Sequence, residues 1–425
     1  MHARNPVFIL TLAAALLAAQ SVTPETVVAT VNGRKITAGD VDRILLGAPP
    51  ALRENLRQNR KLFLENYALV STLAATAEKE RLPERSPYRE QLAWMRGQVL
   101  MQAAISERYQ QFRAGTSDAE AEVRLREWLN HINREATVTV ENEQALARLE
   151  TVSAGEVVAV VKGRRMTAGE LLALLRGASP QIQQNLRANP KQFLVELARM
   201  NALVEYAEKE QLPEKSPYRE QLDWVRSDLL SQAILNDFNL RNPATAEEEK
   251  QYYDSRRDDF TEARVKVIYI SFAAEAKARS SEGRKYRSEQ EARAAVELLR
   301  KQILEGADFI ELVKKHSEDA DSRAKDGDLG VIRRKDQIPE AIKEAIFSLK
   351  PGQVSQVVRQ PNGFYLFRVE EIRTKTLDEV RDEVNREVQS AKFQGWFDGI
   401  RKSVAVTYEN EGYFRQPEAG PASER

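Results

Sequence analysis

The stretch ERLPERSPYREQLAW, from Glu80 to Trp94, returns almost unchanged as EQLPEKSPYREQLDW, from Glu210 to Trp224. The two stretches lie 130 positions apart, and a pattern this specific does not recur by chance. In each, Leu-Pro is typical of the end of one helix and Ser-Pro of the start of the next. The stretch therefore predicts a joint between two helices, and we expect its residues to have a structural role.

The repeat extends well beyond this joint. Residues 26–107, the first copy, align without a gap with residues 156–237, the second copy, and about half of the paired positions are identical. Each copy begins with a β-branched stretch and a glycine turn, which predict a strand, and Thr-Ala-Gly then leads into a short helix. Apolar residues at helical spacing follow and predict two longer helices.

A second alignment has a different offset. Residues 127–143 (EWLNHINREATVTVENE) resemble residues 395–411 (GWFDGIRKSVAVTYENE), but 268 positions apart, so the second copy carries an insertion of 138 residues. We expect the first copy to form one module, residues 26–145, whose last strand pairs with its first. The second copy, residues 155–260 and 375–412, would be the same module opened to hold a guest domain.

The inserted segment, residues 263–372, has a pattern of its own. Val265–Phe272 is predicted to form a strand, and helices are predicted to begin at the capping residues Ser288 and Asp308. One strand, two or three helices and two further strands indicate a small α+β domain. A capping box at Thr376–Glu379 predicts the start of the long helix that returns to the second module.

The insert resembles a parvulin-type peptidyl-prolyl isomerase domain along its whole length, notably in EGADFIELVKKHSEDADSRAKDGDLG, FSLKPGQVSQVV and NGFYLFRV. The flanking segments resemble the core of SurA-like and PrsA-like exported folding chaperones. These resemblances imply an α+β protein with two tandem, mainly helical chaperone modules, the second holding a parvulin-like domain of order βα3βαβ2. They also imply a folding factor that binds unfolded or nascent secreted and outer-membrane polypeptides and isomerises their X-Pro bonds.

The resemblance also implies a site within the insert. Asp319 matches a polar position at which family members carry Asp or Cys, and Asn362 is the small polar residue before the last strand. Tyr269 and Tyr365 stand where family members usually have two histidines. By resemblance, Asp319 and the two tyrosines would be catalytic, and Asn362 would contact substrate. The residues that match the apolar proline slot are Leu329, Ile338, Ile342 and Phe347.

Isomerisation of an X-Pro bond breaks no covalent bond. The amide rotates over a barrier of about 18–20 kcal/mol, because resonance is lost in the twisted form. A catalytic site therefore needs an apolar slot, desolvation of the amide and polar groups that favour the twisted state. Tyrosines can donate hydrogen bonds, but Tyr269 and Tyr365 depart from the family pattern. So do Ile338 and Ile342, which are commonly Met and Phe in the family, and Asp326, which replaces the first glycine of its Gly-Gly-Asp. Two hypotheses stay open: a weak isomerase, and an inactive domain that only binds peptide in a holdase chaperone.

Composition excludes several other classes of protein. Lys and Arg total 64, as do Asp and Glu, so no net field recruits nucleic acid or an anionic membrane. The absence of cysteine excludes disulfides, thiolate metal sites and a cysteine nucleophile. The histidines, His2, His131 and His316, are too scattered for a metal site or a catalytic triad. We therefore expect no metal, no cofactor and no nucleic-acid partner.

Residues 1–21 have the pattern of a secretory signal peptide. Arg4 is followed by the apolar stretch Val7–Ala19, which is too short to span a bilayer, and small residues at 19–21 suit a signal peptidase. A buried first helix is the alternative, but the stretch lacks an amphipathic period. We expect an exported, periplasmic protein without stable membrane insertion, and a disordered tail over residues 413–425.

The duplication itself suggests a function. Two modest apolar sites on one chain raise avidity through effective concentration, so we expect the two copies to widen a client-binding surface. The four tryptophans occupy matching places in the two copies and are expected to pack in the cores. They are Trp94, Trp128, Trp224 and Trp396.

Overall fold

The computed structural model describes residues 22–178, 180–273 and 287–415. The predicted signal peptide, residues 1–21, lies outside them. The chain divides into two compact units, one holding the described residues up to Arg241 and from Gln394 onward, the other Asn242–Phe393. Among the described helices, none is both long and apolar enough to cross a membrane.

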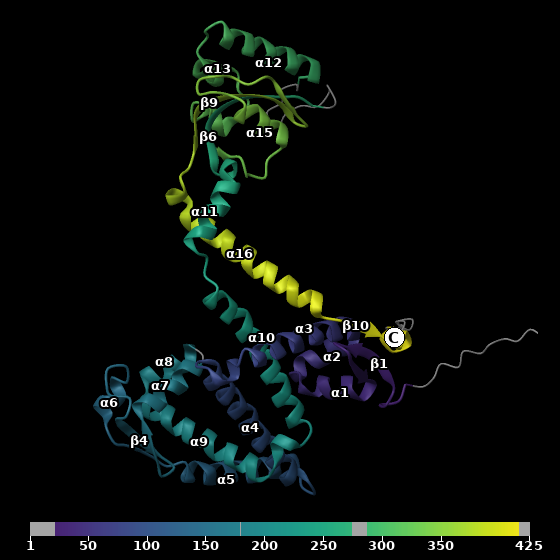
Figure 1. Ribbon diagram of the computed structural model, residues 1–425, viewed down its shortest axis with the longest axis vertical. Coiled ribbons are helices and arrows are strands. Elements are labelled where there is room, and N and C mark those ends of the chain that lie inside the picture. Colours follow the sequence, from purple (N-terminus) through teal and green to yellow (C-terminus); the bar gives the residue numbers. More distant parts are fainter. Residues whose placement is uncertain (1–21, 179, 274–286, 416–425) are drawn as a thin grey trace, which may run out of the picture. The chain divides into compact units, whose positions relative to one another are not determined.

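Within the first unit, the two copies form the same elements in the same order (Figure 1). The elements of the first copy are β1 (Val27–Val31), β2 (Arg34–Thr37), α1 (Ala38–Gly47), α2 (Pro50–Gln58), α3 (Arg60–Lys79), a 3-10 turn (Leu82–Glu84), α4 (Tyr88–Arg113), α5 (Asp118–Glu135), β3 (Val138–Val140) and α6 (Glu143–Ala147). Those of the second copy are β4 (Val157–Val161), β5 (Arg164–Thr167), α7 (Ala168–Gly177), α8 (Pro180–Ala188), α9 (Pro190–Lys209), a 3-10 turn (Leu212–Glu214) and α10 (Tyr218–Arg241). The repeated stretch is thus the joint between two helices, as its Leu-Pro and Ser-Pro pairs predict.

The copies exchange their closing strands. β3 pairs antiparallel with β4 of the second copy, Val138 opposite Val161. β10 (Val406–Tyr408), near the end of the chain, pairs with β1 of the first copy, Val406 opposite Val31. The expectation that the first copy closes on its own first strand is therefore wrong. The physical reason is the packing of α4, which lies against α7 and α9 of the second copy with Trp94 stacked on Phe193, so that the chain reaches β4 rather than β1.

Each small sheet, with its helices, forms a lobe built from both copies. The first lobe contains β1, β2 and α1–α3, closed by α10, the end of α16 (Leu377–Ser403), β10 and α17 (Glu411–Phe414). The second lobe contains β4, β5 and α7–α9, closed by α4, α5, β3 and α6. Since each lobe takes its closing elements from the other copy, residues 26–145 do not form a lobe by themselves.

Tryptophans from the long helices join the two copies. Trp224 of α10 stacks on Phe63 of α3, with ring centroids 6.4 Å apart, and Trp94 of α4 stacks on Phe193 of α9 at 6.3 Å. The interplanar angle is 8° in both pairs. Ion pairs follow the same symmetry: Arg226 with Glu78, and Arg96 with Glu208, their counterparts 130 positions away.

The second unit contains the inserted domain and a stem. Its elements are α11 (Ala246–Ser255), a 3-10 turn (Arg257–Phe260), β6 (Thr261–Ser271), α12 (Glu289–Leu304), α13 (Phe309–His316), α14 (Ala320–Arg323), β7 (Asp328–Arg333), α15 (Glu340–Phe347), β8 (Val358–Gln360), β9 (Gly363–Thr374) and the first part of α16. The strands form one antiparallel sheet of order β7-β6-β9-β8. The predicted order βα3βαβ2 is confirmed. The predicted caps are present, because Ser288 accepts from Glu291 N and Asp308 accepts from Glu311 N.

The stem extends the unit beyond residues 263–372. Tyr253 and Phe260 pack against Val380, Val384 and Val388 of α16 in a small core. The hydroxyl of Tyr253 also donates to the carbonyl of Lys375, 2.6 Å away. The segments before and after the inserted sheet therefore pack together as a short helical stem.

The end of the chain differs from the sequence expectation. Tyr413 and Phe414 lie in α17 and are buried in the core of the first lobe, where Arg60 lies over the Tyr413 ring. A disordered tail starting at residue 413 is therefore wrong for these residues. Residues 416–425 lie outside the described part of the chain.

Candidate functional site

The site implied for the insert centres on two tyrosines. β6 and β9 place Tyr269 directly opposite Tyr365, and the ring centroids lie 4.7 Å apart. The Tyr269 hydroxyl donates to the backbone carbonyl of Asn362 at 2.6 Å, and the Asn362 side-chain amide lies 3.1 Å from the Tyr365 hydroxyl. The fold thus brings together three of the residues named from the sequence.

Gly363 makes this arrangement possible. A Cβ atom at this position would lie 2.4 Å from Cε2 of Tyr269 and 2.6 Å from the carbonyl oxygen of Ile270. Only glycine leaves room for the Tyr269 ring to cross the start of β9.

Asp319 is the N-cap residue of the short helix α14. Its carboxylate caps α14 and accepts from Ser322 N at 3.2 Å. The preceding residues make the link to β6 instead, because Ser317 Oγ accepts from Tyr269 N and Glu318 N donates to Tyr269 O. A position for Asp319 near the strand is observed, and its catalytic role stays a prediction.

Glu318 is a residue that the sequence reasoning missed. Its carboxylate accepts from both the backbone N–H and the hydroxyl of Ser271, and it pairs with Arg287. Burial raises the pKa of Glu318, but the Ser271 hydrogen bonds and the Arg287 charge outweigh it and hold the pKa below its usual value. The only sequence signal was its place in Ser317-Glu318-Asp319, between two helix ends. It stays ionised at neutral pH and fixes the segment that carries Asp319.

The apolar slot residues fall into two groups. Ile342 and Phe347 of α15 pack, together with Tyr365, against one buried cluster on the sheet. Leu329 of β7 is 40% exposed, and Ile338 is half-buried just before α15. The structure therefore brings Ile342 and Phe347 together with Tyr365, whereas a place for Leu329 and Ile338 in the same slot stays a prediction.

The loop before β7 has a glycine-like backbone conformation at position 326, where this chain has Asp. Asp326 has a left-handed backbone with φ of 55°, and Gly327 follows with φ of 83°. Asp tolerates this region better than most residues, although it costs roughly 1–2 kcal/mol relative to glycine. Lys314 Nζ lies 3.3 Å from the Asp326 carboxylate. The substitution of Asp for Gly at this position is therefore compatible with the fold.

Residues 271–371 match the PPIC-type PPIASE domain of the rotamase family. The inserted domain is a PPIC-type isomerase domain. The match runs from the last residue of β6 into β9 and includes Asp319, Tyr365 and the four slot residues, whereas Tyr269 lies just before it. Within the described ranges, no group of three or more His, Asp or Glu side chains could hold a metal ion.

Several curated relatives are similar to this chain over part of its length. The Chaperone SurA of Nitrosospira multiformis is 35% identical over 130 residues, which cover 29% of each chain. The Foldase protein PrsA of Caldanaerobacter subterraneus is 29% identical over 157 residues, or 37% of this chain and 44% of the relative. This chain therefore matches less than half the length of these two relatives.

Part of the chain is also similar to solved structures. A SurA-like chaperone of Campylobacter jejuni is 22% identical over 57% of this chain and 94% of that chain, with a TM-score of 0.32.

Proposed function

We propose that this protein is an exported folding factor that binds unfolded secreted or outer-membrane polypeptides and isomerises their X-Pro bonds. The observation that carries the proposal is the PPIC-type domain, in which Tyr269, Tyr365 and Asn362 meet beside apolar side chains. Relatives named Chaperone SurA and Foldase protein PrsA support the choice. The place of action would be the periplasm.

The proposed mechanism uses only binding and polarity. The proline ring packs on Leu329, Ile342 and Phe347, which excludes water from the amide. Desolvation weakens amide resonance, because the planar form is the more polar one and is better solvated by water. The tyrosine hydroxyls, held by Asn362, supply dipoles beside the twisted amide. Glu318 keeps the segment carrying Asp319 docked on β6, and no proton transfer is required.

A second function is favoured by one specific observation. The Tyr269 hydroxyl already donates its proton to the Asn362 carbonyl, so it cannot donate to a substrate without breaking that bond. A domain that binds peptide without catalysis, within a holdase chaperone, is therefore the alternative.

The test is the exchange rate of a short X-Pro peptide in the presence of the full chain. We expect acceleration, and an at least tenfold lower kcat/KM for Leu329→Ala, about 1.4 kcal/mol of transition-state stabilisation. Leu298→Ala on α12, which removes another exposed leucine, is the matched control and should keep the wild-type rate. An exchange rate equal to the uncatalysed one would reject the enzyme and leave the holdase.

A further inference from the structure

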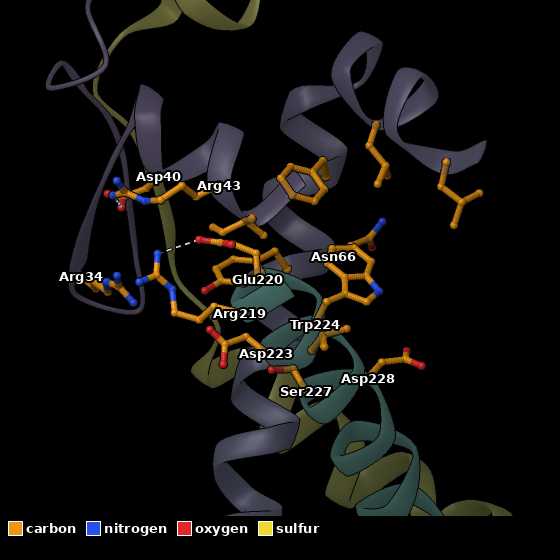
Figure 2. Close-up of a pocket in the computed structure, with 16 residues that line it drawn as sticks. Arg34, Asp40, Arg43, Asn66, Arg219, Glu220, Asp223, Trp224, Ser227 and Asp228 are labelled. Carbon is orange, nitrogen blue, oxygen red and sulfur yellow. Dashed lines mark hydrogen bonds and ion pairs between the residues drawn. The ribbon is translucent and has the colours of Figure 1, made fainter. Parts of the chain in front are cut away.

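The first lobe contains a pocket of about 490 Å³. α1, α2 and α3 of the first copy form one side of it, and α10 of the second copy forms the other (Figure 2). Its volume lies in the range of natural ligand pockets, roughly 300–1,000 Å³. The pocket exists because α10 crosses onto the helices of the other copy, and it lies wholly within the first unit.

The lining of the pocket is mainly apolar, and part of it faces solvent. Leu52 is 51% exposed, and Leu56 of the same helix is half-buried. The apolar lining residues are Ile44, Leu52, Leu56, Phe63, Val70 and Trp224. Such a surface can receive one large apolar side chain of another polypeptide.

The same place in the second lobe is filled. Met200 stands at the position of Val70, and its Sδ lies 3.5 Å from where a Cβ on Gly97 would be. Met200 is 9% exposed and Leu197, the counterpart of Tyr67, is 3% exposed. In the first lobe, Tyr67 and Val70 are only half-buried. One fold thus has an open pocket in one lobe and a packed core in the other.

The second copy contributes to the open pocket a carboxylate that the closed lobe lacks. Asp223 of α10 has Ala93 as its counterpart in α4, and Figure 2 shows it on the α10 side with Trp224 and Ser227. Among the described residues, no hydrogen bond or ion pair joins Asp223 to a partner. The two arginines whose charge reaches it are both engaged, Arg219 with Glu220 and Arg226 with Glu78.

The other charges of the pocket are mostly paired. Asp40 binds Arg43, and Asp228 accepts from Gln232. Arg34 of β2 forms no hydrogen bond or ion pair within the described part of the chain, whereas its counterpart Arg164 pairs with Glu170. Asp223 is exposed at the rim of the pocket, and partial burial raises its pKa, so a cation placed beside it would stabilise its ionised form. The place of Asp223 next to Trp224 puts that cation beside the apolar lining.

We propose that this pocket binds an extended polypeptide, taking one large apolar side chain and holding a neighbouring lysine or arginine on Asp223. The proposal rests on the proposed function only in that the occupant is an unfolded client. It needs no proline, and it gives the duplicated region one open client site where the repeat alone predicts two.

The test uses the full chain and two proline-free ten-residue peptides that differ at one position, Phe-Lys in one and Phe-Ser in the other. We expect the Phe-Lys peptide to bind more tightly and to quench or shift Trp224 fluorescence, with an advantage that fades at high salt. Val70→Met, which copies the second lobe, should weaken both peptides at least tenfold. Asp223→Ala should weaken only the Phe-Lys peptide, by about threefold to tenfold.

Controls separate the possible failures. Glu127→Ala removes an exposed carboxylate from α5 in the second lobe and should leave both affinities unchanged. Thermal unfolding reports whether Val70→Met is folded, and if it is not, the two-peptide comparison with Asp223→Ala still decides. Unchanged affinity in Val70→Met, equal binding of the two peptides, or no binding by the wild type would overturn the proposal.

Two further outcomes point elsewhere. If the wild type dimerises and Val70→Met does not, the occupant is a second copy of this chain and the proposal is wrong. The X-Pro exchange rate is measured on the same samples. Loss of isomerase activity with intact binding of the proline-free peptides would reject the proposed enzyme and keep this site, and the reverse result would do the opposite.

Discussion

The two lobes of the first unit are built from nearly the same sequence, yet one is open and the other is closed. Both have a three-stranded sheet whose edge strand comes from the other copy, and both have a tryptophan stacked on a phenylalanine. They differ at the interface between their long helices, which is α3 with α10 in the first lobe and α9 with α4 in the second. Val70, Tyr67 and Asp223 leave a pocket in the first lobe, whereas Met200 and Leu197 fill the second. The two copies therefore form one closed lobe and one lobe with an open pocket.

The largest effect is expected from removing the end of the chain after Phe393. This deletion takes away Trp396, β10, Tyr413 and Phe414, which close only the first lobe. Each large buried side chain contributes roughly 1.5–3 kcal/mol, so the loss exceeds about 5 kcal/mol, comparable to the stability of a domain. Hydrogen exchange should show lost protection in β1 and β2.

The internal control is the hydrogen-exchange protection of β4 and β5 in the same deletion variant. These strands are closed by β3, which the deletion does not touch, so they should stay protected. Protection of β1 unchanged by the deletion would mean that β10 does not close the first lobe.

The second prediction compares Trp94→Ala with Trp224→Ala. Trp94 packs in the filled lobe, so its removal leaves a cavity and should cost about 3–5 kcal/mol. Trp224 lines the open pocket, and water can enter the space that it leaves, so about 1–3 kcal/mol is expected. Urea unfolding of the two variants measures the difference. Equal losses would mean that the two lobes are packed alike.

The sequence predicted much of this unit because its signals are local. The joint at Leu82 and Pro87, the capping residues Ser288 and Asp308, and the order of the inserted domain all follow from residues close together in the chain. The exchange of closing strands was missed for a physical reason. β3 (VTV) and β10 (VTY) are almost the same strand, as are β1 (VVATV) and β4 (VVAVV), so local pairing does not distinguish the two arrangements. The packing of α4 on α9 of the other copy decides between them.

The candidate sites were predictable to different degrees. Tyr269, Tyr365 and Asn362 were named together because a family pattern spans them, and cross-strand register then places them in contact. Glu318 was missed, since its role depends on Arg287 and Ser271, which lie far from it in sequence. The pocket in the first lobe depends on α10 of one copy meeting α3 of the other. No alignment of the copies with each other could reveal it.

The third prediction opens the closed lobe. Met200→Val copies the first lobe and removes a buried side chain that lies against Gly97, at a cost of about 1 kcal/mol. The space freed should admit a second, weaker binding event for the Phe-Ser peptide, seen by calorimetric titration as a stoichiometry above one. Without Asp at position 93, the Phe-Lys peptide should gain no advantage there. A stoichiometry unchanged in a folded Met200→Val would show that side-chain volume alone does not separate the lobes.

The smallest effect concerns the stability cost of Asp223. Its folded-state pKa is raised above the usual 3.8 by partial burial, so its ionised form is disfavoured in the folded chain. The stability that this group contributes is present below the unfolded pKa and is lost as pH rises through the raised folded value. Asp223→Ala should therefore be slightly more stable than the wild type at pH 7, by about 0.5 kcal/mol or less for a surface site, and no more stable at pH 3.

The reverse substitution in the second lobe, Ala93→Asp, should lower stability at pH 7. Urea unfolding at the two pH values gives both comparisons. If Asp223→Ala were instead less stable at pH 7, the carboxylate would support the fold, and its place in the open pocket would need no ligand to account for it.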